Sequence, residues 1–467
     1  MAGKKQSFTP EEKLARALVP QDQQPYKLPK GWVWTRLENI AELITGNTPS
    51  KKEQTYYGND VPFYKPADLD AGRHVCTPSE YLSKNGAAVG RLIPTGATSV
   101  CCIGSIGKCG FIENPGCTNQ QITSVIPYFN NLYIYYLCQS PLFQTELIEK
   151  SSSTTISIVN KAKMGKCIIP LPPLPEQQRI VARIESLFTK LDAARDKLQQ
   201  VLDTQEARRA AILHKAFTGQ LTGHKGSAEC RGKREEERSK NPEGTEFVPE
   251  GWKKVKLTEV CAINPKKIST KGLDDSLKVS FFPMASLDER LGKITKPEIR
   301  TLSEVKKGFT NFSEADVVLA KITPCFENGK AAIIGPLMNH IGYGTTEFFV
   351  LRSTQDLYNK FLFYFIRSPK FRSEAKAHMT GAVGQQRVPK DFIENYNFML
   401  PPLEEQCRIV DILDSLLNKE YQASTIAQSS LSQIDLLKKS ILARAFRGQL
   451  GTQDPSDPDA RELLTRD

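Results

Sequence analysis

The chain of 467 residues is too long for one ordinary domain, so two or three domains are expected. Its 63 Lys and Arg residues outnumber its 52 Asp and Glu residues, and the net charge of +11 raises the expectation of a polyanionic partner. The 11 cysteines show no CxxC spacing and the five histidines are not paired at helical spacing, so we expect no metal site and reduced, buried thiols. The sequence has no signal peptide and no apolar run of membrane-spanning length, which predicts a soluble, cytoplasmic protein.

An N-terminal tail (1–27) precedes a first globular region, which we expect over 28–170. This region opens with LPKGWVWTRL at 28–37 and continues in short apolar runs around Gly-rich turns, such as ATSVCCIGSIGKCG from residue 97. Short apolar runs bounded by turn residues predict strands, and an aromatic-rich run before SPLF at 140–143 predicts a helix. The region is therefore expected to be an α+β domain.

A long helix is expected next, over 171–222. The apolar positions from Ile180 to Ile212 follow alternating steps of four and three, with polar interruptions at Gln205 and Arg208. This pattern is typical of a coiled-coil seam. A proline in the first turn and a glycine after the last one are the usual start and stop signals. About 42 helical residues at ~1.5 Å each make a rod of roughly 60 Å.

The same organisation returns after a charged linker (223–246), with a second globular region over 247–399, a second long helix over 400–450 and a C-terminal tail (451–467). LPPLPEQQRIVARIESLFTKL and LPPLEEQCRIVDILDSLLNKE, which begin the two helices, share 12 of 21 residues. ILHKAFTGQL and ILARAFRGQL, which end them, share seven of ten at the same offset of 229. The sequence is thus a tandem repeat of a globular domain followed by a long helix.

These elements predict an α+β protein with two globular domains, whose long helices pair with each other as an antiparallel coiled coil. Two apolar stripes of equal length favour such pairing over the alternative, in which each helix packs only on its own domain. An antiparallel pair would place the two domains at opposite ends with pseudo-twofold symmetry. A parallel pair would place them at the same end.

The motifs of the common DNA-modifying and nucleotide-hydrolysing enzymes are missing from the sequence. GSIGKC and ENGKAA lack the spacing of a phosphate-binding P-loop. No Asn-Pro dipeptide is followed by the aromatic residue of an amino-methyltransferase, no Gly-rich strand–helix junction suggests S-adenosylmethionine, and no carboxylate cluster suggests a nuclease metal site. We therefore expect a chain that is not an enzyme and binds no cofactor or metal.

Polar side chains suited to DNA gather instead in loops of both globular regions. Asn and Gln amides can pair with adenine in the major groove, and Lys and Arg contact phosphates. TNQQIT at 118–123 and GQQRVPK at 384–390 hold most of these residues, and the offset of 229 aligns the second loop with SSSTTISIVNK at 151–161. Each residue is also compatible with an ordinary hydrogen-bonded surface loop. The candidate DNA-binding residues are Lys108, Asn119, Gln120, Gln121, Lys161, Lys330, Gln385, Gln386, Arg387 and Lys390.

The paired LPPLPEQQRIV and LPPLEEQCRIV, the paired AFTGQL and AFRGQL, and the Pro-x-Gly-Trp openings resemble the specificity subunits of type I restriction–modification enzymes. The resemblance covers nearly the whole chain. It implies two target-recognition domains that each read one half of a split, asymmetric site in double-stranded DNA, and paired helices that dock two methyltransferase subunits. It also implies restriction subunits with a DNA translocase, so that S-adenosylmethionine, ATP and Mg are expected on the partner subunits.

Two other interpretations stay open at the level of sequence. The chain can serve a methyltransferase-only or a fused restriction system with the same reading logic. It can also be a coiled-coil scaffold for protein partners, whose basic charge is incidental. Salt-dependent, sequence-selective binding of duplex DNA distinguishes a reader from a scaffold.

Overall fold

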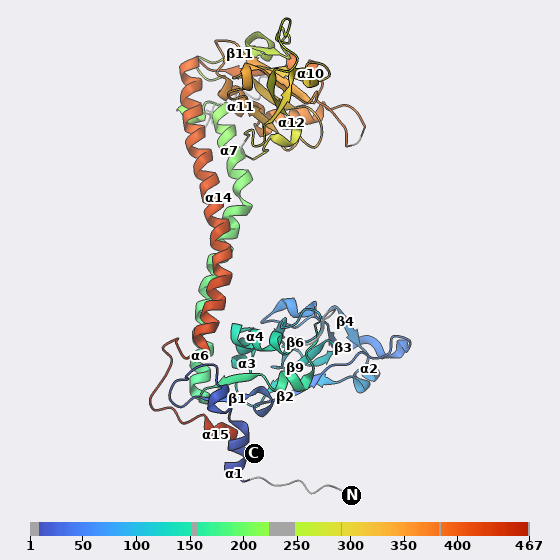
Figure 1. Cartoon of the computed structure of the whole chain (residues 1–467), viewed down its shortest axis with the longest axis vertical. Coiled ribbons are helices and arrows are strands. Elements are labelled where there is room, and N and C mark those ends of the chain that lie inside the picture. The colour runs from blue at the N-terminus through green and yellow to red at the C-terminus, as the bar shows by residue number, and fades with distance from the viewer. Residues whose placement is uncertain (1–8, 152–156, 224–247, 291, 383, 466–467) are drawn as a thin grey trace, which may run out of the picture. The chain divides into compact units, whose positions relative to one another are not determined.

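The computed structural model describes residues 9–151, 157–223, 248–290, 292–382 and 384–465 (Figure 1). By its internal contacts the chain divides into two compact units. We call residues 1–199 with 428–467 the first unit and residues 200–427 the second unit. The linker expected at 223–246 lies outside the described residues except for its first residue, Gly223.

Two four-stranded sheets form the globular domain of the first unit. Their strand orders are β2–β9–β6–β7 and β4–β3–β8–β5, and β1 pairs separately with β10. All pairs are antiparallel except β3 with β8. The strands are β1 (Val33–Arg36), β2 (Ala41–Thr45), β3 (Tyr57–Tyr64), β4 (Glu80–Leu82), β5 (Leu92–Ile93), β6 (Thr98–Cys101), β7 (Cys109–Phe111), β8 (Gly116–Thr118), β9 (Ile122–Pro127) and β10 (Ile168–Leu171).

Short helices cover these sheets and connect them to the long helix. Ser140 ends α3 and caps α4, where its hydroxyl accepts a hydrogen bond from the amide of Phe143. The helices that begin in this unit are α1 (Pro10–Ala17), η1 (Gln21–Gln23), η2 (Leu37–Asn39), η3 (Gln54–Tyr56), η4 (Asp68–Ala71), α2 (Lys84–Val89), α3 (Asn131–Gln139), α4 (Pro141–Glu149), α5 (Lys161–Gly165), α6 (Leu174–Asp203) and α15 (Arg461–Leu464).

The second unit repeats this sheet topology strand for strand. Its orders are β12–β19–β16–β17 and β14–β13–β18–β15, with β11 on β20, and again a single parallel pair, β13 with β18. The two matching domains confirm the predicted α+β repeat. The strands are β11 (Lys253–Lys256), β12 (Cys261–Ile263), β13 (Lys278–Phe282), β14 (Glu298–Thr301), β15 (Thr310–Phe312), β16 (Val317–Ala320), β17 (Ala331–Ile333), β18 (Gly342–Gly344), β19 (Phe348–Ser353) and β20 (Asn397–Leu400).

The helices that follow β9 in the first unit and β19 in the second match between the units, α11 with α3, α12 with α4 and α13 with α5, whereas η7 has no counterpart among the described helices of the first unit. Ser368, at the start of SPKF, caps α12 through the amide of Phe371, as Ser140 caps α4. The helices are α7 (Gln205–Phe217), η5 (Gln220–Thr222), α9 (Leu257–Val260), η6 (Met284–Ser286), α10 (Leu302–Val305), η7 (Met338–His340), α11 (Asn359–Ile366), α12 (Pro369–Ala377), α13 (Lys390–Glu394) and α14 (Leu403–Ala445).

Each globular core contains the start of one long helix and the end of the other. In the first unit, Tyr133 of α3 and Ile180 of α6 are buried together with Phe446, which follows α14. In the second unit, Phe361 of α11 and Ile409 of α14 are buried with Leu213 of α7 and other residues. The repeated AF-x-GQL endings therefore serve to anchor each helix end in the other copy's core.

The two Glu-Gln pairs of the LPPL motifs are buried polar residues with structural roles. Gln177 donates to the carbonyl of Pro172 (2.9 Å), and Gln406 donates to that of Pro401 (2.9 Å). Glu176 and Glu405 are also buried and bind the threonine that follows the other helix. The bonds are Thr452 Oγ1 to Glu176 Oε1 (2.7 Å) and Thr222 Oγ1 to Glu405 Oε1 (2.6 Å).

Ion pairs between the long helices run in antiparallel order in the first unit. In the first unit Lys438 of α14 contacts Asp192 of α6 (2.5 Å), and Asp435 contacts Arg195. The residue number rises on one helix as it falls on the other, as the antiparallel interpretation predicts. Continuous coiled-coil packing along the whole seam, and the pseudo-twofold arrangement of the domains, stay predictions.

The first long helix is not one continuous element, contrary to the expectation of a single helix within 171–222. It is divided at Thr204 into α6 of 30 residues and α7 of 13, whereas α14 runs for 43 residues without a break. Arg208 lies at the break: its guanidinium donates to the carbonyl of Val201 (3.0 Å) and to both carboxylate oxygens of Glu420 on α14 (3.0 Å each). The polar interruption read in the sequence at this residue thus marks the break.

The described parts of both tails pack on the first unit. Figure 1 shows α1 and α15 close together beneath the first globular domain. Ala460 N donates to the carbonyl of Gly31 (2.9 Å), and Tyr26 OH donates to the carbonyl of Phe446 (2.9 Å). In the part of the chain that the structure describes, no helix combines the length and apolarity needed to cross a membrane.

Candidate nucleic-acid interface

The β8–β9 loop of the first unit carries the three candidate amides, but it uses them differently. Asn119 is buried; its Nδ2 donates to Gln121 Oε1 (2.9 Å), and its Oδ1 accepts from Gln121 N (3.1 Å). Gln120, between them, is exposed. Asn119 and Gln121 therefore hold the loop in shape, and Gln120 is the side chain that the loop presents to solvent.

The segment after β2 lies directly against this loop. Asn47 N donates to the carbonyl of Thr118 (3.0 Å), and the Thr48 hydroxyl donates to the side-chain oxygen of Gln120. A methyl group on Gly46 would lie 2.2 Å from the Thr118 carbonyl oxygen, so the two backbones approach this closely only because residue 46 has no side chain. The contact fixes Gln120 with its amide nitrogen free to donate.

Exposed cations flank Gln120. Lys51 and Lys52 follow Thr48 in the same segment, and Arg91 donates to the carbonyl of Thr45 at its start (2.7 Å). Within the described ranges, none of the three cations forms an ion pair with a carboxylate. Cations free of carboxylates beside an exposed amide are suited to contact phosphates while the amide contacts a base edge.

Sequence reasoning missed this segment, although the repeat contained a signal for it. The first unit has TGNTPSKK at 45–52 and the second has INPKK at 263–267, each an Asn–Pro–Lys-Lys pattern directly after the first strand of a sheet. In the second unit the Asn264 side-chain oxygen accepts from Val350 N (3.0 Å), and Lys267 Nζ donates to the carbonyl of Phe309 (3.0 Å).

In the second unit the candidate residues of GQQRVPK lie beside the loop between β18 and β19. The Arg387 guanidinium donates to both carboxylate oxygens of Glu347 (2.9 to 3.2 Å), a hydrogen bond that holds the pKa of Glu347 below its usual range. Gln385 is exposed, and the carbonyl of Gln386 accepts from Thr323 N (2.9 Å). Arg387 is therefore a paired residue, and Gln385 and Gln386 carry the free side-chain amides.

Equivalent main-chain bonds place these loops at the same point of both domains. In the first unit, Cys102 N donates to the carbonyl of Gln121 (2.7 Å), and Val159 N donates to that of Cys102 (2.9 Å). The corresponding bonds of the second unit are Lys321 N to Glu347 O and Val388 N to Lys321 O (both 2.9 Å). The structure thus brings the two candidate loops, which differ in sequence position within their domains, to equivalent surfaces.

The four candidate lysines fall into two equivalent pairs. Lys161 begins α5 and Lys390 begins α13, as the offset of 229 predicts; both are exposed, and Lys390 pairs with Glu394 one turn later (2.6 Å). Lys108 precedes β7 and is paired with Asp70 (2.7 Å). Lys330 precedes β17 and is partly exposed. The role of each in DNA contact stays a prediction.

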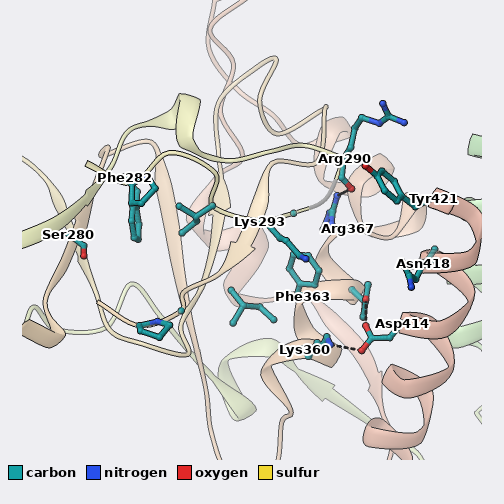
Figure 2. Close-up of a pocket in the computed structure, with 18 of the residues that line it drawn as sticks. Ser280, Phe282, Arg290, Lys293, Lys360, Phe363, Arg367, Asp414, Asn418 and Tyr421 are labelled. Atoms are coloured by element: carbon teal, nitrogen blue, oxygen red, sulfur yellow. Dashed lines mark hydrogen bonds and ion pairs between the residues drawn. The ribbon is translucent and has the colours of Figure 1, made fainter. Parts of the chain in front are cut away.

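A cleft of about 1180 Å³ opens in the second unit between the globular domain and its part of α14 (Figure 2). On one wall Asp414 of α14 accepts from Tyr364 OH (2.5 Å) and pairs with Lys360 Nζ (2.5 Å). Arg367 Nη2 donates to the carbonyl of Arg290 (3.1 Å), and both residues line the cleft together with Tyr421 of α14. The first unit has a similar cleft of about 1160 Å³.

The thiols give no sign of redox or metal chemistry. Seven of the ten cysteines in the described residues are buried, and burial raises the pKa of Cys102 to about 11 and of Cys109 to about 12. Neutral thiols are poor nucleophiles and poor metal ligands. Within the described ranges no group of His, Cys, Asp or Glu is arranged to hold a metal ion.

Comparison with known proteins gives one consistent result. A family model described as the type I restriction modification DNA specificity domain matches residues 29–203 and 249–428. Two Escherichia coli proteins, the specificity subunits of the type I restriction enzymes EcoEI and EcoAI, are 37% identical over 261 residues. That alignment covers 47% of this chain and 43% and 44% of theirs, so it spans less than half the length of these relatives.

Other relatives match over nearly the whole chain. The EcoKI specificity subunit of Escherichia coli strain K12 is 23% identical over 440 residues, which cover 91% of each protein. The HsdS subunit from Thermoanaerobacter tengcongensis has a TM-score of 0.62 at 21% identity, covering 92% of this chain and 100% of that one. A structure from work on assembly and conformational transition of the type I R-M system has a TM-score of 0.64 at 21% identity, covering 91% and 100%. At these identities the structures show a common fold.

Proposed function

We infer that this chain, which belongs to the type I restriction modification DNA specificity family, is the subunit that selects the DNA sequence on which a restriction–modification complex acts. Each globular domain reads one half of a bipartite, asymmetric site in double-stranded DNA. The long helices separate the two readers and dock two methyltransferase subunits, to which restriction subunits are added. The chain itself performs no chemistry, and S-adenosylmethionine, ATP and Mg belong to the partners.

The observation that carries this proposal is the duplication of one surface on two domains. Both domains present polar loops at the same point of the same sheet topology, but the side chains differ: Gln120 with Lys51, Lys52 and Arg91 in one domain, and Gln385 and Gln386 in the other. Recognition of two unlike half-sites by the same fold in both domains requires different exposed polar side chains in their loops. The excess of Lys and Arg supports a polyanionic partner.

The roles of individual residues follow from their contacts. Gln120 is proposed to donate to a base edge, because Thr48 occupies its oxygen and leaves its nitrogen free. Lys51 and Lys52 are proposed to contact phosphates. Arg387 is proposed to position its loop through Glu347 and to touch DNA only if that pair opens.

A domain exchange tests the proposal. Residues 28–170 are replaced by the equivalent region of another family member, and the complex is expressed with its methyltransferase partner. We expect methylome sequencing to show a new sequence in one half of the methylated motif and no change in the other. A simultaneous change of both halves, or an unchanged motif in an active complex, contradicts independent reading.

A second experiment tests the division of chemistry. The chain purified alone, with S-adenosylmethionine, magnesium and ATP supplied, is expected neither to methylate nor to cleave DNA. Addition of the methyltransferase subunit restores methylation. Activity that co-purifies with the chain alone contradicts the assignment of catalysis to its partners.

We also propose that the chain works in the cytoplasm, because the DNA and the partner subunits proposed for it are expected in that compartment.

A further inference from the structure

Three arginines from separate elements of the second unit line one cleft of about 840 Å³. Arg209 comes from α7, Arg367 follows α11, and Arg372 lies on α12; Arg290, from the loop after η6, lines the same cleft. Arg367 is buried, and Arg209 and Arg372 are half-buried. The cleft lies within the second unit, so its walls are positioned by one compact body.

Among the described residues, the hydrogen bonds of these three guanidiniums go to backbone carbonyl oxygens, and one buried guanidinium nitrogen has no hydrogen-bond partner. Arg367 Nη2 donates to the carbonyls of Glu289 (2.6 Å) and Arg290 (3.1 Å), and Arg209 Nη1 donates to the latter (3.3 Å). The buried Nε of Arg372 has no hydrogen-bond partner. In the described chain none of the three forms an ion pair with a carboxylate.

Three acidic residues of the described chain line the cleft without an ion pair to this cluster. Glu327 is paired with Lys376 (3.2 Å), and Glu289 accepts from Asn328 (3.1 Å). Glu206, on α7, also lines the cleft. Burial, followed by repulsion from a neighbouring arginine, lowers the pKa of Arg209, and likewise lowers that of Arg367 to about 9. Burial also lowers the pKa of Arg372; the charges of Glu206 and Glu327 partly offset this for Arg372, as that of Glu206 does for Arg209. Three like charges are partly removed from water here, and none has an ion pair with a carboxylate among the described residues, so the cluster has less counter-charge than normally accompanies such burial.

The first unit shows that the scaffold does not need this cluster. The residues at the places of Arg367 and Arg372 are Gln139 and Gln144, both neutral and both hydrogen bonded. The place of Arg209 is taken by Lys438, which is paired with Asp192. The residue of the second unit that corresponds to Asp192 is Tyr421, which carries no carboxylate. Among the described residues, the second unit therefore has three guanidiniums without an ion pair where the first unit has two neutral amides and one paired lysine.

We propose that the cleft formed by Arg209, Arg367 and Arg372 binds a phosphate group. Guanidinium forks match the oxygens of phosphate, and three of them together exceed what a two-oxygen carboxylate can accept. The phosphate belongs either to a DNA backbone or to a free phosphate compound. The site is a property of the second unit alone and does not depend on the function proposed above.

The first arm of the test uses the full chain and inorganic phosphate. The thermal unfolding midpoint is measured against phosphate concentration, with chloride at equal ionic strength as reference. We expect phosphate to raise the midpoint of the wild type, because a ligand that binds the folded state stabilises it. Arg372→Gln, which installs the residue of the first unit, is expected to weaken the apparent affinity by roughly tenfold or more.

Two further variants keep the result interpretable. Arg408→Gln removes the same charge from an exposed residue of α14 outside the cleft, and its phosphate response should equal that of the wild type. Tyr421→Asp supplies the carboxylate that the first unit has at Asp192, and it should suppress the response without removing an arginine. The proposal is overturned if phosphate stabilises the wild type no more than chloride, or if it stabilises Arg372→Gln equally. Stabilisation by polyglutamate but not by phosphate overturns it in favour of a protein partner.

The second arm identifies the source of the phosphate. Binding of a duplex DNA to the chain is measured over a range of salt concentrations for wild type, Arg372→Gln and Arg408→Gln. If the ligand is a DNA backbone phosphate, the slope of log K against log salt falls by about one in Arg372→Gln alone. If it is a free phosphate compound, the slope is unchanged, while the response to inorganic phosphate and to a nucleoside triphosphate is lost.

Discussion

The two units share a sheet topology, a set of helix caps and a pair of buried Glu-Gln motifs, yet they differ at the residues that face their clefts and loops. The place of Gln121 in the first unit is taken by Glu347 in the second, where it pairs with Arg387. In the first unit Asp192 pairs with Lys438. The corresponding residues of the second unit are Tyr421 and Arg209, so Arg209 has no carboxylate at the equivalent place. The scaffold is the same in both units and the exposed polar side chains differ, as the proposed reading of two unlike half-sites requires.

The largest expected effect concerns Gln406, whose bonds are more numerous than those of its counterpart. Gln406 donates to Pro401 O and Asp356 O and accepts from Tyr358 N, whereas among the described residues the Gln177 side chain bonds only to Pro172 O. Gln406→Leu leaves three backbone groups unpaired and should cost roughly 3–5 kcal/mol of stability. Gln177→Leu, the matched control, should cost about 1–2 kcal/mol. Equal losses in calorimetric unfolding would show that the two motifs are energetically alike.

The next effect concerns the close contact between backbones at Gly46. Gly46→Ala puts a methyl group 2.2 Å from the Thr118 carbonyl oxygen, so the segment must move away from the β8–β9 loop. We expect a loss of about 2–3 kcal/mol and weaker recognition of one half-site. Gly335→Ala is the control, since a Cβ there meets nothing within 4 Å. Unfolding midpoints and methylome sequencing measure the two consequences, and a fully stable Gly46→Ala would refute the steric argument.

The break in the first long helix gives a smaller effect. The repeat places Leu437 where the first helix has Arg208, so Arg208→Leu gives the first helix the residue of the unbroken one. The variant leaves Glu420 without its guanidinium partner and should lose about 1–2 kcal/mol, discounted because both side chains are partly exposed. Hydrogen exchange at residues 201–208 tests the break: slower exchange in the variant would show that Arg208 maintains it. Glu420→Gln is the control that removes the charge but keeps the arginine.

The smallest expected effect is at Gln120, and it concerns specificity. Thr48 holds the Gln120 oxygen, so only the amide NH2 group remains for a base, and the bidentate donor–acceptor pairing is lost. Gln120→Ala should therefore relax one base position of one half-site by about 1 kcal/mol, the lower end of the range for direct readout. Lys52→Ala should instead weaken binding to all sequences and reduce the salt slope by about one. An unchanged motif and affinity in Gln120→Ala would return that residue to an ordinary surface role.

Much of the architecture could be predicted because it depends on patterns of neighbouring residues and because these patterns occur twice in the sequence. Alternating apolar steps, proline starts and the offset of 229 gave the long helices, the two domains and the equivalence of Lys161 with Lys390. The candidate site was predicted in part. The exposed Gln120 and Gln385 lie on the loops that the sequence indicated, but the burial of Asn119 depends on how its loop folds back on itself.

What the sequence by itself determined is the duplicated scaffold, since periodicity and repetition are properties of neighbouring residues and of fixed spacing. What only the tertiary structure decided is which charges meet. Arg387 pairs with Glu347, forty residues away in the sequence, and Arg209, Arg367 and Arg372 converge from separate elements without an ion pair to a carboxylate among the described residues. Pairing between distant side chains depends on the packing of the sheets and helices that carry them, and no local pattern encodes it. The free or neutralised state of each charge, and hence the chemistry of each surface, was therefore settled by the fold.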